Sequence, residues 1–255
     1  MNVSVLIQTH NEEKHIEECI KSARYLTDSI VVVDMKSTDN TSKIAKQNGA
    51  TVISFTSYPF YVEPAREFGI KEIKTEWVMI LDADERMTKN LAREIREKTD
   101  CNNKITHYKI PRKNIFGGKK WLKYGGWWPD EQIRLINLSA FKKWPTDIHS
   151  TPVISGQLGY LKEPFVHLFH GSISSMVEKT LIFEDIESEL LYKHNKPVSV
   201  ILFFRKFLGE LWRRLFIKMG FLDGIIGIIE CVYQAFSKTI TYLFLYEKKE
   251  KSRPL

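Results

Sequence analysis

Short apolar runs alternate with stretches of helical periodicity over the first 100 residues of the chain. Four runs predict β-strands, because they are short, rich in β-branched residues and bounded by polar or turn residues: Val3–Thr9, Ile30–Val33, Thr51–Phe55 and Trp77–Leu81. Helices are predicted between them, around Ile16–Ala23, Thr41–Gln47 and Glu63–Ile73. This alternation favours an α/β fold with a mainly parallel central sheet flanked by helices, which binds ligands at the carboxyl ends of its strands.

The pattern changes after a fourth predicted helix, near Leu91–Lys98. Residues from Thr106 to Val166 predict strands and loops rich in Gly, Trp and Pro, whereas from about Ser174 the pattern is helical, with breaks expected at Pro197 and Gly220. We therefore expect a body over residues 1–195 and a C-terminal helical extension over 196–255.

Length and charge narrow the class of protein. The 255 residues, 43% of them hydrophobic, suffice for one sizeable α/β domain with an appendage. Of the net charge of +7, most lies in residues 196–255, which hold 11 Lys or Arg against 5 Asp or Glu, while residues 1–195 hold 27 against 26. A nearly neutral body with a cationic, aromatic-rich end indicates an anionic lipid surface as partner and not a nucleic acid.

The cysteines and the N-terminus both indicate the cytosol. Cys19, Cys101 and Cys231 are odd in number, far apart and without metal-ligand spacing, so we expect reduced, packing thiols. The first residues lack a basic segment and turn polar after Ile7, which predicts a first strand and no signal peptide.

Acidic residues follow two of the predicted strands. Asp82 and Asp84 come directly after Leu81, and two carboxylates at a rigid strand end, together with substrate phosphates, are suited to Mg²⁺ or Mn²⁺. Asp34 closes the second strand, where an acidic residue can accept hydrogen bonds from a nucleoside. The alternatives are a solvated loop at Asp82-Ala83-Asp84 and a helix-capping turn after Asp34, in which we assign the capping role to Asp39.

Four ordered motifs resemble those of family 2 glycosyltransferases, which have the GT-A fold. In chain order they are Val3–Glu12, Asp34 with Ser37–Thr41, Ala65-Arg66 with Gly69-Ile70, and Leu81–Glu85. Gly125–Ile136 and Gly220–Gly227 further resemble the branch that contains lipopolysaccharide core β-1,4-glucosyltransferases.

The resemblance implies an enzyme that uses a nucleotide-diphosphate sugar and a divalent metal, Mg²⁺ or Mn²⁺. Residues 1–100 would bind the nucleotide sugar and residues 101–195 the acceptor. Asp34 would contact uracil, Arg66 the base or a phosphate, Asp82 the ribose and Asp84 the metal. The implied nucleotide-sugar site comprises Thr9, Asn11, Glu12, Asp34, Arg66, Asp82 and Gln132.

In the inverting members of the family, a carboxylate on the acceptor side removes the proton of the attacking hydroxyl. Asp130, in the pattern Asp130-x-Gln132-x-Arg134, matches that position, and Arg134 would stabilise the diphosphate through paired donors. Without the resemblance, Asp130 simply begins a strand and Arg134 pairs with a surface carboxylate.

A late histidine near the metal is also implied. We expect His170, which ends an apolar strand before Gly171, to be the third ligand, with His149 as an acceptor-pocket residue or rival ligand. The alternative is that each histidine is a hydrogen-bonded structural residue.

The extension combines apolar and basic residues in a way that suits a lipid interface. The predicted helix Val198–Met219 carries five cations beside Trp212 and Phe216, while the apolar run Phe221–Tyr246 is interrupted by charges, so we expect no spanning helix. A soluble bundle packed on the body or on another subunit is the alternative. We expect a peripheral location on the inner face of the cell membrane.

The sequence thus predicts an inverting hexosyltransferase. It would move a hexose, glucose by resemblance, from a UDP-sugar to a lipopolysaccharide-core or other lipid-linked glycan. Three alternatives stay open: the same reaction on a capsule, teichoic or peptide acceptor, a sugar-phosphate nucleotidyltransferase, and an inactive membrane-interaction module.

Overall fold

The computed structural model describes residues 2–57, 61–101, 104–148, 150–169 and 173–252. Within these residues the chain forms two compact units, the first made of residues 1–113 and 130–167 and the second of residues 114–129 and 168–255. The unit boundaries fall inside two strands, β6 (Ile105–Phe116) and β12 (Phe165–Phe169). The predicted division into a body over residues 1–195 and a helical extension over residues 196–255 stays a prediction.

The first unit contains the predicted alternation of strands and helices. Its first half comprises β1 (Val3–Thr9), α1 (Ile16–Ala23), β2 (Ile30–Asp34), α2 (Thr41–Gln47), β3 (Thr51–Ser54), α3 (Glu63–Glu72), β4 (Trp77–Asp82), β5 (Glu85–Arg86) and α4 (Lys89–Asp100). The rest of the unit adds β8 (Asp130–Asn137), β9 (Phe141–Lys143), β10 (Val153–Ile154) and β11 (Gln157–Tyr160) to parts of β6 and β12.

The main sheet is parallel in one half and mixed in the other. Its order is β3-β2-β1-β4-β8-β6-β12-β5, and the first four strands pair in parallel, as predicted. From β4 onward the pairs β4–β8, β8–β6 and β12–β5 are antiparallel. The parallel register sets Thr9 beside Asp34 and Gln8 beside Asp82, so the polar residues that follow these strands meet at one edge.

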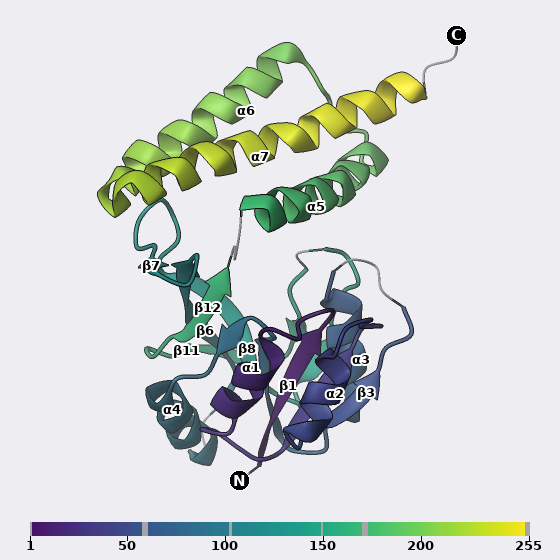
Figure 1. Cartoon of the computed structure of the whole chain (residues 1–255), viewed down its shortest axis with the longest axis vertical. Coiled ribbons are helices and arrows are strands. Elements are labelled where there is room, and N and C mark those ends of the chain that lie inside the picture. The colour runs from purple at the N-terminus through teal and green to yellow at the C-terminus, as the bar shows by residue number, and fades with distance from the viewer. Residues whose placement is uncertain (1, 58–60, 102–103, 149, 170–172, 253–255) are drawn as a thin grey trace. The chain divides into compact units, whose positions relative to one another are not determined.

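Each face of the parallel half is covered by helices (Figure 1). Alternate residues of β1 point to opposite faces: Val5 and Ile7 pack with apolar residues of α1, α2 and α4, whereas Leu6 packs with those of α3. Gly69 permits the close approach of α3, because a Cβ there would lie 2.7 Å from Val33 Cγ2 and 2.8 Å from Leu6 Cδ1. The core is therefore the two-sided one expected of a parallel sheet.

The second unit is mainly helical. It contains β7 (Lys120–Trp121), paired with the end of β6, and then α5 (Ile173–Lys193), α6 (Val200–Trp212), a π-helical turn η1 (Arg213–Ile217), a 3₁₀ turn η2 (Gly220–Asp223) and α7 (Gly224–Lys251). α5 and α6 both run alongside α7 (Figure 1). The predicted breaks are confirmed, since α5 ends before Pro197 and η2 begins at Gly220.

Segment 114–129 belongs to this second unit through backbone hydrogen bonds. The buried carboxylate of Asp223 accepts from the N–H groups of Lys123 and Tyr124, both at 2.8 Å, and Lys218 O accepts from Gly125 N at 2.8 Å. A residue in η2 thus fixes a loop about a hundred residues earlier in the chain.

Candidate active site

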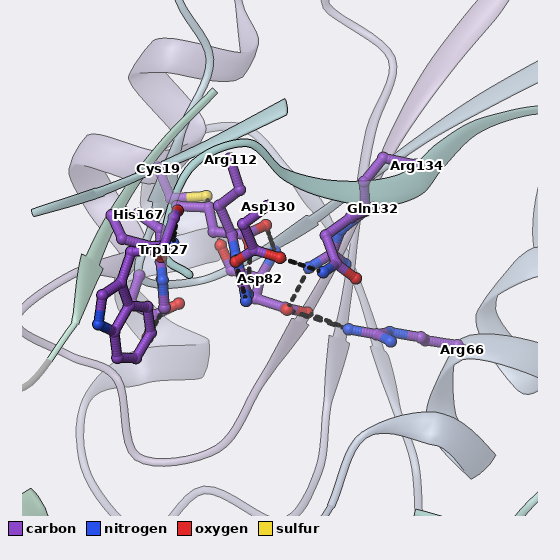
Figure 2. A network of polar contacts seen from close by, with 12 residues as sticks. Cys19, Arg66, Asp82, Arg112, Trp127, Asp130, Gln132, Arg134 and His167 are labelled. Carbon is purple, nitrogen blue, oxygen red and sulfur yellow. Dashed lines mark hydrogen bonds and ion pairs between the residues drawn. The ribbon is translucent and has the colours of Figure 1, made fainter. Parts of the chain in front are cut away.

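The carboxyl end of β4 carries a cluster of carboxylates and guanidinium groups (Figure 2). Arg66 of α3 donates from Nη2 to both oxygens of Asp82, each at 3.0 Å, and Arg134 of β8 donates from Nη2 to Asp82 Oδ2 at 2.7 Å. The same Arg134 nitrogen lies 2.9 Å from Glu85 Oε1, and Glu85 Oε2 accepts from the Asp82 N–H at 2.9 Å. These contacts make Asp82 an anchored carboxylate.

The charges of this cluster are strongly coupled. Loss of hydration raises the pKa of Asp82, but Arg134 and Arg66 outweigh this effect and hold that pKa well below its usual range. Burial raises the pKa of Glu85, which has no exposed side-chain surface, and Arg134 opposes the rise. Asp82 is therefore ionised, and Arg134 compensates two carboxylates at once.

Asp84 contacts a different side chain from those that hold Asp82. Its Oδ2 is 3.5 Å from His167 Nε2, and both side chains keep some contact with solvent. The contact arises because β12 pairs with β5, which sets His167 beside Glu85, the residue after Asp84. An imidazole thus lies against the carboxylate predicted to bind the metal, three residues before the predicted His170.

Part of the predicted metal site lies outside the described residues. His170 and its rival His149 both lie outside the described residues, so their roles stay predictions. Within the described residues, no group of three or more His, Cys, Asp or Glu side chains gathers as a complete metal site. Asp84 and His167 would supply two of the ligands that an ion needs there.

Asp130 has both carboxylate oxygens in hydrogen bonds. Arg112 of β6 places Nε and Nη2 2.7 Å from Oδ2, and Gln132 Nε2 donates to Oδ1 at 2.7 Å. Arg112 Nη1 also lies 3.8 Å from Glu85, so one guanidinium connects Asp130 with the cluster on β4 (Figure 2). The structure brings Asp130, Gln132 and Arg134 together with Asp82, and their predicted roles in the reaction stay predictions.

Arg134 is buried, with its donated bonds directed at Asp82 and Glu85 and its guanidinium stacked 5.6 Å from the centre of the Phe165 ring. Its Nε and Nη1 have no hydrogen-bond partner among the described residues. Contact between Arg134 and a diphosphate stays a prediction.

The predicted nucleotide side of the site shows both structural and unpaired polar groups. Asn11 Oδ1 accepts from Thr38 N at 2.8 Å, Glu12 N donates to Thr41 Oγ1 at 2.8 Å, and Asp34 Oδ1 accepts from Ser37 N at 3.2 Å. These bonds join the loops after β1 and β2. Asp39 Oδ1 accepts from Thr41 N at 2.9 Å, but the N-cap of α2 is Asn40, so Asp39 supports the first turn from the residue before the cap.

Several polar atoms at the same edge are buried without a protein partner. They belong to residues beside Asp34 and Asp82, and within the described residues they comprise Thr9 Oγ1, Gln8 Nε2 and Oε1, and Arg66 Nε. Buried polar groups in folded proteins are nearly always paired, so such a group near a candidate site indicates a place for a ligand or water.

Five residues of this site were not given a role by the sequence: Gln8, Glu85, Arg112, Trp144 and His167. Glu85 stood in a conspicuous acidic motif, and the polar His167 on the same strand face as Phe165 was a usable signal. Arg112 and Trp144 carried none, because their contacts depend on tertiary structure: Trp144 lies 5.0 Å under the Arg66 guanidinium and donates its backbone N–H to Glu67.

Comparison with known proteins agrees with this geometry. A mixed α/β sheet with carboxylates at the end of its fourth strand fits the GT-A class, and residues 4–158 match glycosyl transferase family 2. The chain belongs to that family, and it is an enzyme that uses a nucleotide sugar.

Relatives span nearly the whole chain. An uncharacterized glycosyltransferase of Rickettsia conorii is 25% identical over 98% of this chain and 92% of its own length, and one of Rickettsia typhi is 28% identical over 98% and 89%. A lipopolysaccharide core biosynthesis glycosyltransferase, LpsC of Rhizobium meliloti, is 27% identical over 44% of this chain and 42% of its own length. The crystal structure of residues 1–349 of TarS from S. aureus, in complex with UDP-GlcNAc, has a TM-score of 0.51 at 14% identity and covers 98% of this chain and 92% of that one, which shows a shared fold.

Proposed function

We propose that the protein is an inverting, metal-dependent hexosyltransferase that moves a hexose, with glucose as the first candidate, from a UDP-sugar to a lipopolysaccharide-core or other lipid-linked glycan. The observation that carries the proposal is that the two aspartates after β4 have different side-chain partners. Asp82 is held by two guanidinium groups, whereas Asp84 lies 3.5 Å from His167.

The pair of Asp84 and His167 fits a divalent ion. Donor atoms that share one ion at a bond length near 2.1 Å lie about 3 Å apart, close to the separation seen here. One carboxylate with one imidazole favours Mn²⁺ over Mg²⁺, since imidazole suits transition metals and magnesium prefers oxygen. When bound, the ion would neutralise the charge that develops on the leaving diphosphate.

The other residues divide into positioning and reacting groups. Arg66 and Arg134 hold Asp82 where a ribose would meet it, and the unpaired atoms of Thr9 and Gln8 supply further polar contacts for the nucleotide. Asp130 removes the proton from the acceptor hydroxyl, with its oxygens oriented by Arg112 and Gln132. Attack from the face opposite the diphosphate inverts the anomeric centre.

The nature of the donor and acceptor is supported by similarity. The structure of TarS, which shares this fold, holds UDP-GlcNAc, and LpsC, a relative over less than half of the chain, acts in lipopolysaccharide core biosynthesis. The cationic extension suits a lipid-linked acceptor, and we place the reaction at the cytoplasmic face of the cell membrane.

The test is a screen of nucleotide sugars for hydrolysis and transfer, with and without Mn²⁺. We expect His167→Ala to raise the Mn²⁺ concentration for half-maximal rate by at least about tenfold, because a ligand is lost, and Asp84→Ala to abolish the metal response. His194→Ala, in an exposed turn of the second unit, is the matched control. Full activity in the presence of a chelator, or an unchanged metal response in both variants, would contradict the proposal.

Acceptors are compared in the same assay. Purified lipid-linked core oligosaccharide, a teichoic polymer and a polypeptide are offered with the best donor, and the anomeric configuration of the product is measured by NMR. We expect transfer to the lipid-linked glycan with inversion, and transfer only to a polypeptide would contradict the acceptor class.

A further inference from the structure

α7 exposes a row of apolar side chains that a helix of a water-soluble protein would bury. Apolar side chains are exposed along one face at spacings of three, four and seven: Ile225, Ile229, Val232, Phe236 and Leu243. Ile225 is 77% exposed. Amphipathic helices of soluble proteins direct such a stripe at the core, so the outward face of α7 lacks its apolar partner within the described residues.

Polar residues of α7 are found on the inward face instead. Ser237 and Thr241 are buried and donate hydrogen bonds to the two carboxylate oxygens of Glu184 on α5. Tyr233 Oη donates to Thr180 Oγ1 at 2.7 Å. These contacts fix the rotation of α7 about its axis, so the exposure of its apolar face is set by packing.

The neighbouring helix adds a second apolar stripe. Exposed side chains recur every four residues from the start of α6 through η1: Val200, Phe204, Leu208, Trp212 and Phe216. Trp212, at 60% exposure, is an amphipathic side chain that suits the boundary between lipid and water. Together the two stripes give the pair of helices α6 and α7 an unusually apolar surface.

Over residues 200–246 the exposed charge of α6 and α7 has one sign, and the exposed Glu247 beyond them pairs with Lys251. Between residues 200 and 246, all of which the structure describes, the exposed charged side chains are Arg205, Lys206, Lys218 and Lys238. The acids of the same stretch are withdrawn: Asp223 and Glu230 are buried, and Glu210 pairs with Arg213 and Arg214 at 2.7 Å. A second copy of this cationic surface would repel the first, whereas an anionic lipid surface would attract it.

A groove of about 590 Å³ opens between the beginning of α6 and the end of α7. Its lining is mostly apolar and includes Val200, Phe203, Phe204, Tyr242, Leu243 and Tyr246, with Lys249 and Glu250 also on its wall. Such a lining matches an acyl chain.

We propose that the outward faces of α6 and α7 form an interfacial docking surface for an anionic lipid bilayer, with the groove occupied by a lipid acyl chain. The stretch Gly220–Lys251 is, among the described residues, a helical segment long and apolar enough to cross a membrane. It lies along the interface, because exposed Lys238 is at the middle of α7, where a spanning helix would place it at the bilayer centre.

The test is flotation of the full chain with vesicles, without substrates, so that its result does not depend on catalysis. One set of vesicles is phosphatidylcholine and the other includes phosphatidylglycerol. We expect binding to the anionic vesicles that weakens with salt, and Arg205→Gln with Lys238→Gln to lower the apparent affinity about tenfold or more.

The apolar face is tested by Ile201→Glu with Leu208→Glu, two residues of α6 that are 81% and 57% exposed. The groove is tested by Phe203→Trp in a Trp212→Phe background, where a lipid brominated in its acyl chain should quench the added fluorescence and unchanged fluorescence would exclude the acyl chain. We expect the Ile201→Glu, Leu208→Glu variant not to bind the anionic vesicles. Tyr160→Glu, which changes an exposed aromatic residue on β11, should bind as the wild type does. Circular dichroism and donor hydrolysis verify folding.

Three results would overturn the proposal. The first is equal binding of the wild type to phosphatidylcholine vesicles and to vesicles that include phosphatidylglycerol. The second is unchanged binding by the Ile201→Glu, Leu208→Glu variant. The third is membrane association that resists both high salt and alkaline carbonate, which would indicate a spanning helix. A wild-type dimer in light scattering that the double variant converts to a monomer would assign the surface to self-association instead.

Discussion

Asp130 illustrates how much of a reacting group's behaviour is set by the side chains around it. Arg112 approaches one carboxylate oxygen with two nitrogens and Gln132 approaches the other, so the plane of the carboxylate is fixed before a substrate arrives. Each oxygen of an ionised carboxylate has two acceptor positions, so donors on both oxygens restrain its rotation.

The first prediction concerns this residue. Asp130→Asn should lower kcat on the order of 10²–10⁴-fold, because the amide cannot accept the proton, while the KM for the donor changes little. Steady-state kinetics measure both constants. Glu131→Gln, a change at the exposed neighbour, should leave both within the error of the wild type, and an active Asp130→Asn variant would exclude Asp130 as the base.

A second prediction at this scale concerns Arg134, which compensates Asp82 and Glu85 from a buried position. Arg134→Met should lower the free energy of unfolding by about 3–5 kcal/mol, because it leaves buried carboxylate charge without its partner. Urea denaturation measures the loss, with Arg93→Met at an exposed position of α4 as control. A loss no larger than that of the control would show that Arg66 and Arg112 suffice.

Among the elements, those that follow from local pattern were predicted well. β1, α1, β2, α2 and β4 have bounds within a residue of those expected, because period-two and helical patterns are encoded in neighbouring residues. The change to antiparallel pairing after β4 and the contact between Asp84 and His167 depend on which strands meet, so sequence pattern did not reveal them.

α7 shows a different limit of sequence reasoning. Its apolar run was predicted to be helical, but the pattern alone does not say which face is outward. That orientation follows from Glu184 of α5, which takes up the hydroxyl groups of Ser237 and Thr241.

The third prediction uses a buried acid of α7. Burial raises the pKa of Glu230 from 4.5 to about 7, although the neighbouring Gln234 amide and the charge of Arg214 oppose the rise. Between those two values the unfolded chain is ionised and the folded chain is not, so folding takes up a proton. The stabilisation from this group is therefore complete below pH 4.5 and lost as pH rises through 7, a difference of about 3 kcal/mol.

Glu230→Gln should remove that slope. Thermal unfolding of the wild type and the variant between pH 5 and pH 8, about the range in which the two pKa values differ, should show the curves diverging toward acid pH in favour of the wild type. Glu247→Gln, at an exposed site on the same helix, should retain the wild-type slope. Parallel curves for wild type and Glu230→Gln would mean that Glu230 is ionised in the folded protein.

For the molecule as a whole, its compact units do not follow chain order. Segment 114–129 belongs with the C-terminal helices, and Asp223 holds it through the N–H groups of Lys123 and Tyr124. Asp223→Ala should lower the free energy of unfolding of that unit by about 1–3 kcal/mol per unpaired N–H, measured by amide hydrogen exchange at Lys123 and Tyr124. Unchanged protection at both amides would show that other contacts hold the segment.

The same feature affects how the protein is made. Lys123 and Tyr124 leave the ribosome about a hundred residues before the carboxylate that binds them, so segment 114–129 lacks that contact until Asp223 has emerged. A contact of such long sequence separation forms late and slowly, as expected from the entropy of closing a large loop. Nascent chains stalled before Asp223 should therefore be susceptible to proteases within that segment and become resistant once the C-terminus is released.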